Sequence, residues 1–323
     1  MDRDLIYSQL GRTIQQTDFT GLGTRYQGKV RDTYRTAEHL VLITTDRISA
    51  FDHILRQTIP FKGQVLNQIA AYFFELTAAQ IPNHVLSVPD PNVTVARPCT
   101  TVPIEFVVRG YLAGHAWREY KSGKRTLCGK PLPEGLKQND RFPTPLLTPA
   151  TKAASGHDED VSRGEILERG LLDEATFDYL ESMALTLFRL GTETAAARGL
   201  ILVDTKYEFG QTATGEYVLI DEIHTPDSSR YFYADTYDEL LARDEPQRQL
   251  SKEFVREWLM EHGFQGKQGQ TLPDLTDDFR VQVASRYIEL YESLTGKTFV
   301  PDTHPDPLSR IQEALAGLTV DLS

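Results

Sequence analysis

The order of apolar and polar residues in the first hundred positions predicts an N-terminal sheet with one helix. Residues 24–36 and 39–45 contain the short apolar runs of strands, and the second range includes four consecutive aliphatic residues. Residues 64–77 instead repeat their apolar positions at helical spacing. We expect this helix to pack against the sheet, so its apolar side chains belong to a core and not to a functional site.

Prolines interrupt this pattern in two places. Five prolines lie between residues 82 and 103, where they exclude a helix and favour loops or edge strands. We interpret this stretch as the approach to a domain boundary. Residues 131–149 are also polar and rich in proline, which predicts a long loop. A loop of this length usually serves a site, and a lid is one interpretation.

Helical periodicity predominates in the last part of the chain. A helix is predicted over residues 172–198, with Asp173 at its N-cap. Pro246 suits the first turn of another helix. The remaining helices are predicted over residues 246–262, 276–294 and 307–316.

The length of the chain predicts two domains, because 323 residues exceed the size at which a single core usually stops growing. We assign residues 1–108 to a β-rich N-terminal lobe. Residues 109–323 are assigned to an α/β lobe that includes the C-terminal helices. Two lobes of this kind predict a cleft in which a ligand binds.

Composition restricts the class of protein. The chain has 46 acidic and 34 basic residues and a formal net charge of −12, which argues against a nucleic-acid surface but permits a small anionic ligand where a few cations converge. No apolar run approaches the roughly 20 residues of a membrane span, and the first residues lack a secretory signal. We therefore expect a soluble, cytoplasmic protein with no membrane partner. Cys99 and Cys128 are too few for a disulfide framework.

The most informative segment is a predicted β-hairpin over residues 199–222. Side chains alternate along a strand, so Asp204, Lys206 and Glu208 share one face. Carboxylates gathered in this way require a compensating cation. Oxygen ligands suit magnesium, which binds a few protein carboxylates together with nucleotide phosphates. The alternative is a solvated polar face with surface ion pairs.

The position of Asp221 depends on the register of this hairpin. If the turn pairs Phe209 with Glu216, Asp221 falls opposite Asp204 and joins the same face. A slip of one residue would turn Asp221 to the other face.

Three further positions are candidates for binding an anion. Gly28 lies within a predicted strand pair, where a missing side chain lets backbone amides approach phosphates and Lys29 follows directly; the segment is not a Walker loop. Arg109 ends an apolar strand-like run. Arg230 lies in a turn-rich loop beyond the acidic hairpin, where its planar fork of donors suits a phosphate.

Two polar clusters are less specific. Asp46, Ser49 and Asp52 share one loop, which is equally consistent with an ordinary turn. His157 and Asp158 belong to a surface cluster or to an incomplete metal site.

Seven motifs, in this order, resemble the phosphoribosylaminoimidazole-succinocarboxamide synthase (SAICAR synthase) family. They occupy residues 26–32, 45–52, 62–68, 107–114, 148–152, 202–210 and 221–231. The resemblance implies an α+β fold of two mixed lobes with largely antiparallel sheets, the nucleotide in the cleft and helices at the C-terminus. It also implies similarity to ATP-grasp and kinase-like folds.

The family implies an ATP-dependent ligase of purine biosynthesis. ATP and Mg²⁺ are the implied cofactors. ATP phosphorylates the carboxylate of an imidazole ribonucleotide, and the amine of L-aspartate attacks the acyl phosphate to give the succinocarboxamide, ADP and phosphate. Phosphorylation removes negative charge from the attacked carbon and supplies a leaving group, so the protein mainly positions groups and neutralises charge.

The resemblance also implies roles for individual residues. Lys206 and Asp204 are the catalytic candidates at the imidazole. The nucleotide candidates are Gly28, Lys29, Val30, Lys152, Glu208 and Asp221, of which the last two hold the metal. The ribonucleotide candidates are Arg109, His115, Ser229 and Arg230. The candidates on the aspartate side are Asp46, Ser49, Asp52, His157 and Asp158.

His115 departs from the family pattern, which usually has serine at this position. An imidazole is bulkier and can become a cation, so we expect His115 to retain phosphate binding and to make the ribonucleotide KM depend on pH. The alternatives are a related carboxylate–amine ligase with another substrate, a nucleotide-binding regulator and a structural protein. The oligomeric state is left open.

Overall fold

The computed structural model describes residues 1–152 and 159–318, and the chain divides into two units. The first unit consists of residues 1–75, 84–98 and 252–323, and the second of residues 76–83 and 99–251. This division differs from the predicted one, which placed the boundary at residue 108 and the C-terminal helices in the second lobe. The sequence pattern of the late helices shows that they have an apolar face, but it does not show which sheet covers that face.

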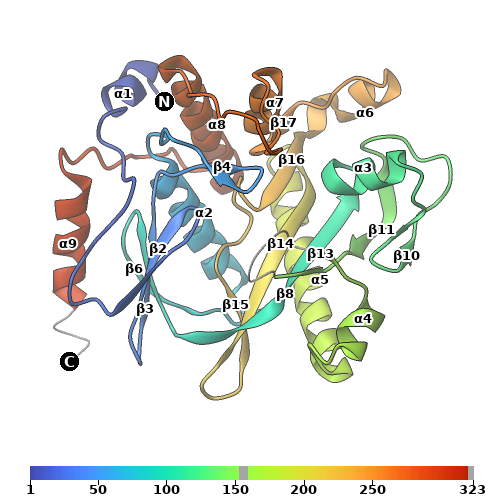
Figure 1. Cartoon of the computed structure of the whole chain (residues 1–323), viewed down its shortest axis with the longest axis horizontal. Coiled ribbons are helices and arrows are strands. Elements are labelled where there is room, and N and C mark those ends of the chain that lie inside the picture. Colours follow the sequence, from blue (N-terminus) through green and yellow to red (C-terminus); the bar gives the residue numbers. More distant parts are fainter. Residues whose placement is uncertain (153–158, 319–323) are drawn as a thin grey trace. The chain divides into compact units, whose positions relative to one another are not determined.

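The first unit is built on a five-stranded antiparallel sheet with the strand order β1-β2-β3-β7-β6 (Figure 1). The strands predicted near the N-terminus and the following helix are confirmed. The sheet strands are β1 (Thr24–Gln27), β2 (Arg31–Arg35), β3 (Leu40–Thr44), β6 (Val85–Asp90) and β7 (Val93–Ala96), and the helix is α2 (Lys62–Thr77). The edge strand β6 contains Pro89, as expected for a proline in a sheet.

The C-terminal part of the chain completes this unit. Ile311 and Leu315 of α9 are buried in one cluster with Tyr34, Ile43 and Val95 of the sheet. The further elements are α1 (Arg3–Ser8), β4 (Ser49–Ala50), β5 (His53–Ile54), α7 (Glu253–Glu261), α8 (Asp277–Thr295) and α9 (Pro307–Leu318).

A charged network also ties α9 to the sheet. Arg310 donates from Nε to Asp90 Oδ2 at 2.8 Å and from Nη2 to Asn92 Oδ1 at 2.5 Å. Both the arginine and the aspartate are buried. The helix predicted from Pro246 begins only at Glu253, because Gln249–Leu250 pair with a strand of the second unit as β17.

The second unit contains a larger sheet with the order β13-β12-β8-β14-β16-β17, to which β11 and β15 are added beside β8 and β14. All of these pairings are antiparallel. The strands are β8 (Cys99–Tyr111), β11 (Arg141–Leu147), β12 (Ala150–Thr151), β13 (Glu159–Asp160), β14 (Leu200–Thr212), β15 (Tyr217–Ile220), β16 (Ser229–Tyr233) and β17 (Gln249–Leu250).

One long helix packs against the centre of this sheet. It is α5 (Glu174–Ala196), and Asp173 caps it by accepting a hydrogen bond from the Thr176 amide, as predicted. Phe177 of α5 contacts Phe106 of β8, with ring centroids 5.9 Å apart. The shorter elements of this unit are α3 (Gly114–Lys121), β9 (Thr126–Leu127), β10 (Lys130–Pro131), α4 (Arg163–Glu168) and α6 (Ala234–Ala242).

The prediction of a long loop over residues 131–149 is wrong. Arg141–Leu147 form β11 in the large sheet, and Leu132 and Phe142 are buried in an apolar cluster. The ladder between β11 and β8 shifts register between Arg141 and Leu146. This irregularity accommodates prolines that a continuous ladder would exclude, which is why the sequence resembled a loop.

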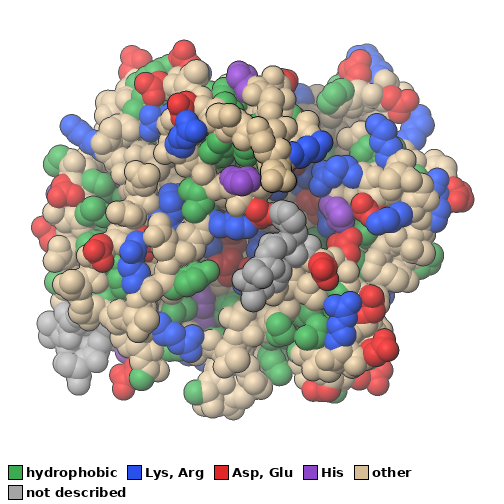
Figure 2. All heavy atoms as spheres, in the orientation of Figure 1, with side chains coloured by type: hydrophobic (Ala, Val, Ile, Leu, Met, Phe, Trp, Pro, Cys, Tyr) green, Lys and Arg blue, Asp and Glu red, His purple; other side chains and the backbone are tan. Residues whose placement is uncertain are grey.

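Within the described residues, no helix has both the length and the apolar content to cross a membrane. On the face shown in Figure 2, basic and acidic side chains lie interspersed.

Candidate functional site

A buried carboxylate lies between two arginines at the centre of the second unit. Asp204 of β14 is directly opposite Arg109 of β8 on one side and Arg230 of β16 on the other. Nη1 of Arg109 is 3.3 Å from Asp204 Oδ2, and Nη1 of Arg230 is 3.2 Å from the same oxygen. Two guanidinium groups directed at one point form a set of donors that suits recognition of an anion.

Local structure holds each arginine in place. Nε of Arg109 donates to Thr148 Oγ1 at 2.9 Å. Burial lowers the pKa of Arg109 and Asp204 opposes this shift, but guanidinium groups stay protonated in proteins. The guanidinium of Arg230 lies against Gly114, where an added Cβ would come within 2.4 Å of Nη1. A glycine is therefore required at position 114 for Arg230 to lie here.

A second charged cluster lies two residues further along β14. Nζ of Lys206 donates to Glu105 Oε1 and to Glu208 Oε1, each at 2.8 Å. Lys152 also pairs with Glu208. Glu105 and Glu208 are directly opposite on adjacent strands, where like charges repel, and the lysine ammonium between them offsets that repulsion.

The pKa values of this cluster follow from burial and charge. Burial alone would lower the pKa of Lys206, but Glu208, Glu105 and Asp221 hold it well above its usual value. Burial would raise the pKa of Glu208, but Lys206 and Lys152 hold it below its usual range. Lys206 and Glu208 are therefore both ionised at neutral pH.

The predicted register of the acidic hairpin is wrong. Phe209 pairs with Leu219, not with Glu216, and the ladder ends at Ile220. Asp221 therefore does not lie opposite Asp204. It has a left-handed backbone with a φ of 65°, and its charge acts on Lys206. The acidic residues predicted to form one cluster therefore belong to two. Asp204 pairs with arginines, while Glu208 and Asp221 act on Lys206.

Sequence reasoning missed Glu105. The signal was a single carboxylate within the apolar run of residues 104–108, because a charge in such a run has to be paired when the strand is buried. It lies four residues before Arg109, and alternation places both on the same face of β8.

The glycine hairpin of the first unit, residues 28–30 between β1 and β2, is held by one buried arginine. Nη2 of Arg47 donates to Gly28 O at 2.9 Å, and its Nε donates to Lys29 O at 3.2 Å. The same guanidinium pairs with buried Asp32 at 2.8 Å and donates to Gln15 O. The carbonyls of the hairpin thus face inward, while the Lys29 side chain is exposed and pairs with Asp52.

The other predicted loop residues have structural contacts. Asp46 is buried and accepts the amides of Ile14 at 2.7 Å and Gly63 at 2.9 Å. Ser49 is buried in β4, and buried Ser229 shares a 2.8 Å hydrogen bond with Thr205. The predicted candidates His157 and Asp158 lie outside the described residues.

The burial of Asp46 predicts that the stability of the fold depends on pH. Burial raises its pKa from 3.8 to about 6 despite two amide donors. The folded chain therefore holds this proton more tightly than the unfolded chain, and ionisation makes folding less favourable. Between roughly pH 4 and pH 6 the free energy of unfolding should fall by up to about 3 kcal/mol through this group.

The measurement is urea unfolding across this pH range for the wild type, Asp46→Asn and Asp18→Asn. The decrease should be smaller in Asp46→Asn, while Asp18→Asn, which replaces an exposed aspartate, should follow the wild type. Equal slopes in all three proteins would contradict the expectation.

His115 lies at the start of α3, directly after Gly114. Its Nε2 is 2.6 Å from Asp160 Oδ2, and Glu119 is also close to it. These two carboxylates would repel a phosphate, which argues against the predicted phosphate contact of His115.

Comparison with known proteins agrees with this architecture. A family model described as SAICAR synthetase matches residues 24–271. The phosphoribosylaminoimidazole-succinocarboxamide synthase of Cytophaga hutchinsonii is 58% identical over 286 residues, which cover 88% of this chain and 92% of the relative.

Two solved structures are similar as well. The SAICAR synthase of Saccharomyces cerevisiae, described as a complex with SAICAR, has a TM-score of 0.77 and 32% identity and covers 89% of this chain and 100% of its own. A SAICAR synthetase in complex with ADP has a TM-score of 0.66 and covers 86% of this chain and 100% of its own; at 24% identity it supports the fold alone.

The fold, the charged side chains of its central strands and the similarity to these relatives identify the chain as a carbon–nitrogen ligase of purine biosynthesis. The matched model covers most of the chain, and the relatives align over nearly their full length. The chain belongs to the SAICAR synthetase family.

Proposed function

We propose that this ligase joins L-aspartate to 5-amino-1-(5-phosphoribosyl)imidazole-4-carboxylate at the expense of ATP. The products are SAICAR, ADP and phosphate. The observation that carries the proposal is the pair of clusters on β14, in which two arginines that meet at Asp204 lie two residues from the Lys206–Glu208 ion pair. The arginines suit a phosphate of the substrate, and the lysine–glutamate cluster suits phosphoryl transfer. The yeast relative described with SAICAR supports the choice of the imidazole ribonucleotide.

The reaction has two steps. A carboxylate oxygen of the imidazole attacks the γ-phosphorus of ATP, and ADP leaves. The amine of aspartate then attacks the carbonyl carbon of the acyl phosphate, phosphate leaves, and the nitrogen loses a proton. Each step moves negative charge between oxygens, so cations that are already in position stabilise it without rearrangement.

Lys206 is the proposed catalytic cation. Its ammonium is ionised at neutral pH and is fixed by two glutamates, so it can offset charge on the transferring phosphoryl group. Asp204 is proposed to act by orienting the two arginines at the imidazole end of the substrate.

Lys152, Glu208 and Asp221 are proposed to bind the nucleotide with Mg²⁺. The donor set fits this metal, since the cluster offers carboxylate oxygens and has two lysines to balance their charge. Bound there, Mg²⁺ would neutralise phosphate charge. Glu105 is added to this group because it shares Lys206 with Glu208.

A separate part of the proposal concerns the glycine hairpin. Lys29 and Val30 are proposed to contact nucleotide phosphates through backbone amides and the exposed Lys29 side chain. Gly28, whose own amide donates to Arg31 O at 2.8 Å, is proposed to let the phosphates approach because it has no side chain. The inward orientation of the Gly28 and Lys29 carbonyls supports this role, because carbonyls directed at a phosphate would repel it.

Arg230→Ala tests the ribonucleotide end. Loss of one charged donor should weaken binding of the imidazole ribonucleotide by about 1.5–3 kcal/mol while leaving ATP affinity unchanged. Isothermal titration with each ligand measures both. Arg189→Ala, which removes an exposed arginine on α5, is the control. An equal loss of affinity for both ligands would count against a phosphate clamp.

The reaction itself is tested by ADP release with ATP, Mg²⁺, the imidazole ribonucleotide and L-aspartate, omitting one component at a time. The product is identified by mass. Release that requires every component and yields the succinocarboxamide supports the proposal. ATP binding without release, or release only with a different carboxylate or amine, would overturn the substrate assignment.

A further inference from the structure

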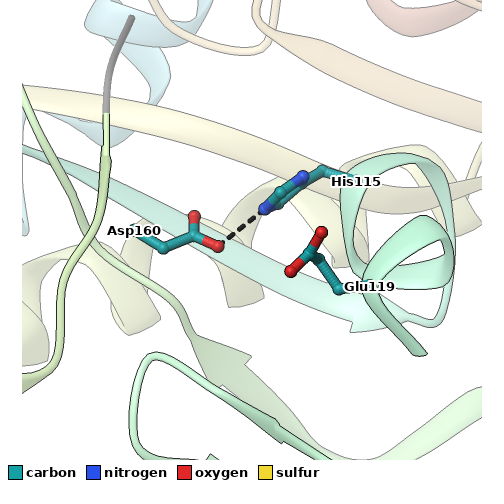
Figure 3. Close-up of side chains that lie close together, drawn as sticks. All are labelled: His115, Glu119 and Asp160. Atoms are coloured by element: carbon teal, nitrogen blue, oxygen red, sulfur yellow. Dashed lines mark hydrogen bonds and ion pairs between the residues drawn. The ribbon is translucent and has the colours of Figure 1, made fainter. Parts of the chain in front are cut away.

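Three metal-ligating side chains converge beside α3, outside the groups assigned to the reaction (Figure 3). His115 and Glu119 are four residues apart and therefore share a face of the helix. Asp160 reaches them from β13. One ligand atom from each residue lies within 4.8 Å of the other two, and His115 Nε2 is 2.6 Å from Asp160 Oδ2.

These separations are close to those of a coordination sphere. Bonds of about 2.0–2.2 Å to nitrogen and oxygen place tetrahedral ligand atoms roughly 3.3 Å apart. Side-chain rotations of His115, Glu119 and Asp160 by about an ångström would reach that spacing. The side chains of His115 and Asp160 are 38% and 36% exposed, so they can rotate and a water can complete the shell.

We propose that His115, Glu119 and Asp160 bind a divalent transition-metal cation, with Zn²⁺ as the best match. One imidazole nitrogen with two carboxylate oxygens suits Zn²⁺ and Co²⁺, whereas Mg²⁺ prefers oxygen ligands alone. Two carboxylates and a neutral imidazole balance the charge of the cation. The site is distinct from the nucleotide metal proposed above, and no step of the proposed reaction depends on it.

A metal ion at this site has to displace positive groups that already contact the three ligands. Asp160 accepts a hydrogen bond from His115. Lys124 pairs with Glu119. A metal ion must replace the proton on the imidazole and the ammonium on Glu119. Removing Lys124 should therefore strengthen binding.

The test is calorimetric titration of the full chain with ZnCl₂, repeated with Co²⁺ and monitored by visible absorption. The wild type should bind one equivalent, and a large excess of Mg²⁺ should not compete. His115→Ser and Glu119→Gln should each weaken binding by at least about tenfold, the lower limit for loss even of a supporting residue around a metal. Lys124→Ala should tighten it.

Two controls make a negative result decisive. Cys128 is half-buried near Asp160, and its thiol donates to the Pro149 carbonyl at 3.4 Å, so we do not count it among the ligands. Cys128→Ser should bind like the wild type, and the Co²⁺ spectrum should lack a thiolate charge-transfer band. Thermal melting checks that each variant is folded. Equal Zn²⁺ affinity in the wild type and His115→Ser, or thiolate bands in the spectrum, would overturn the proposal.

Discussion

Replacing Lys206 with methionine is expected to reduce the turnover number by about 10²- to 10³-fold, the usual effect of removing one preorganised donor at a developing charge. Methionine keeps much of the length of the side chain but removes the ammonium that lies 2.8 Å from both Glu105 and Glu208. The two glutamates then repel each other and any phosphate placed beside them. ADP release at saturating substrates measures the loss.

This variant also loses stability, because two buried carboxylates lose their shared cation. The double variant Lys206→Met/Glu105→Gln relieves the repulsion and should recover part of the melting temperature without recovering turnover. Lys137→Met is the matched control, since Lys137 is exposed and pairs only at the surface with Asp244. Normal turnover in Lys206→Met would remove this lysine from the mechanism.

Arg47→Ala is expected to lower the free energy of unfolding by about 3–5 kcal/mol, the usual cost of removing one partner of a buried ion pair. The Arg47 and Asp32 side chains are 3% and 0% exposed, and the arginine also donates to the carbonyls of Gly28 and Lys29. Without it, the glycine hairpin loses its only described side-chain donor to both carbonyls. Guanidinium chloride unfolding measures the change.

Arg25→Ala provides an internal comparison on the same carboxylate. Arg25 reaches Asp32 at 3.4 Å from a position that is 28% exposed, so its loss should cost no more than about 1 kcal/mol. Similar losses in the two variants would mean that burial does not determine the strength of these ion pairs.

Local features of the fold could be predicted from the sequence. The strands over residues 24–36 and the helix after Asp173 are confirmed, because each depends on periodicity or capping within a short window. The largely antiparallel sheets, which the family resemblance implied, are confirmed as well. The partners of the charged side chains on β14 could be predicted only in part. Alternation places Lys206 beside Glu208, but the partners of Asp204 depend on two neighbouring strands that are distant in sequence.

The errors have a common physical origin, which is that register and partners are tertiary properties. The partner of Phe209 is three residues later than predicted, and Asp221 comes near Lys206 through a left-handed backbone that strand alternation cannot predict. The prolines of β11 predicted a loop. They lie in a strand because the ladder with β8 shifts register there and does not need their amides. Nothing in the pattern of β8 identified Lys206 as the partner of Glu105.

The first unit is assembled from three separate stretches of chain, so it cannot be completed until the third, which begins at Lys252, has been synthesised. Its sheet leaves the ribosome first, but Arg310, the buried partner of Asp90, follows the whole of the second unit. The second unit is almost one continuous stretch and can close its sheet earlier. During synthesis Asp90 and the part of the first sheet that α9 covers therefore stay accessible to water and to chaperones until α9 has been synthesised.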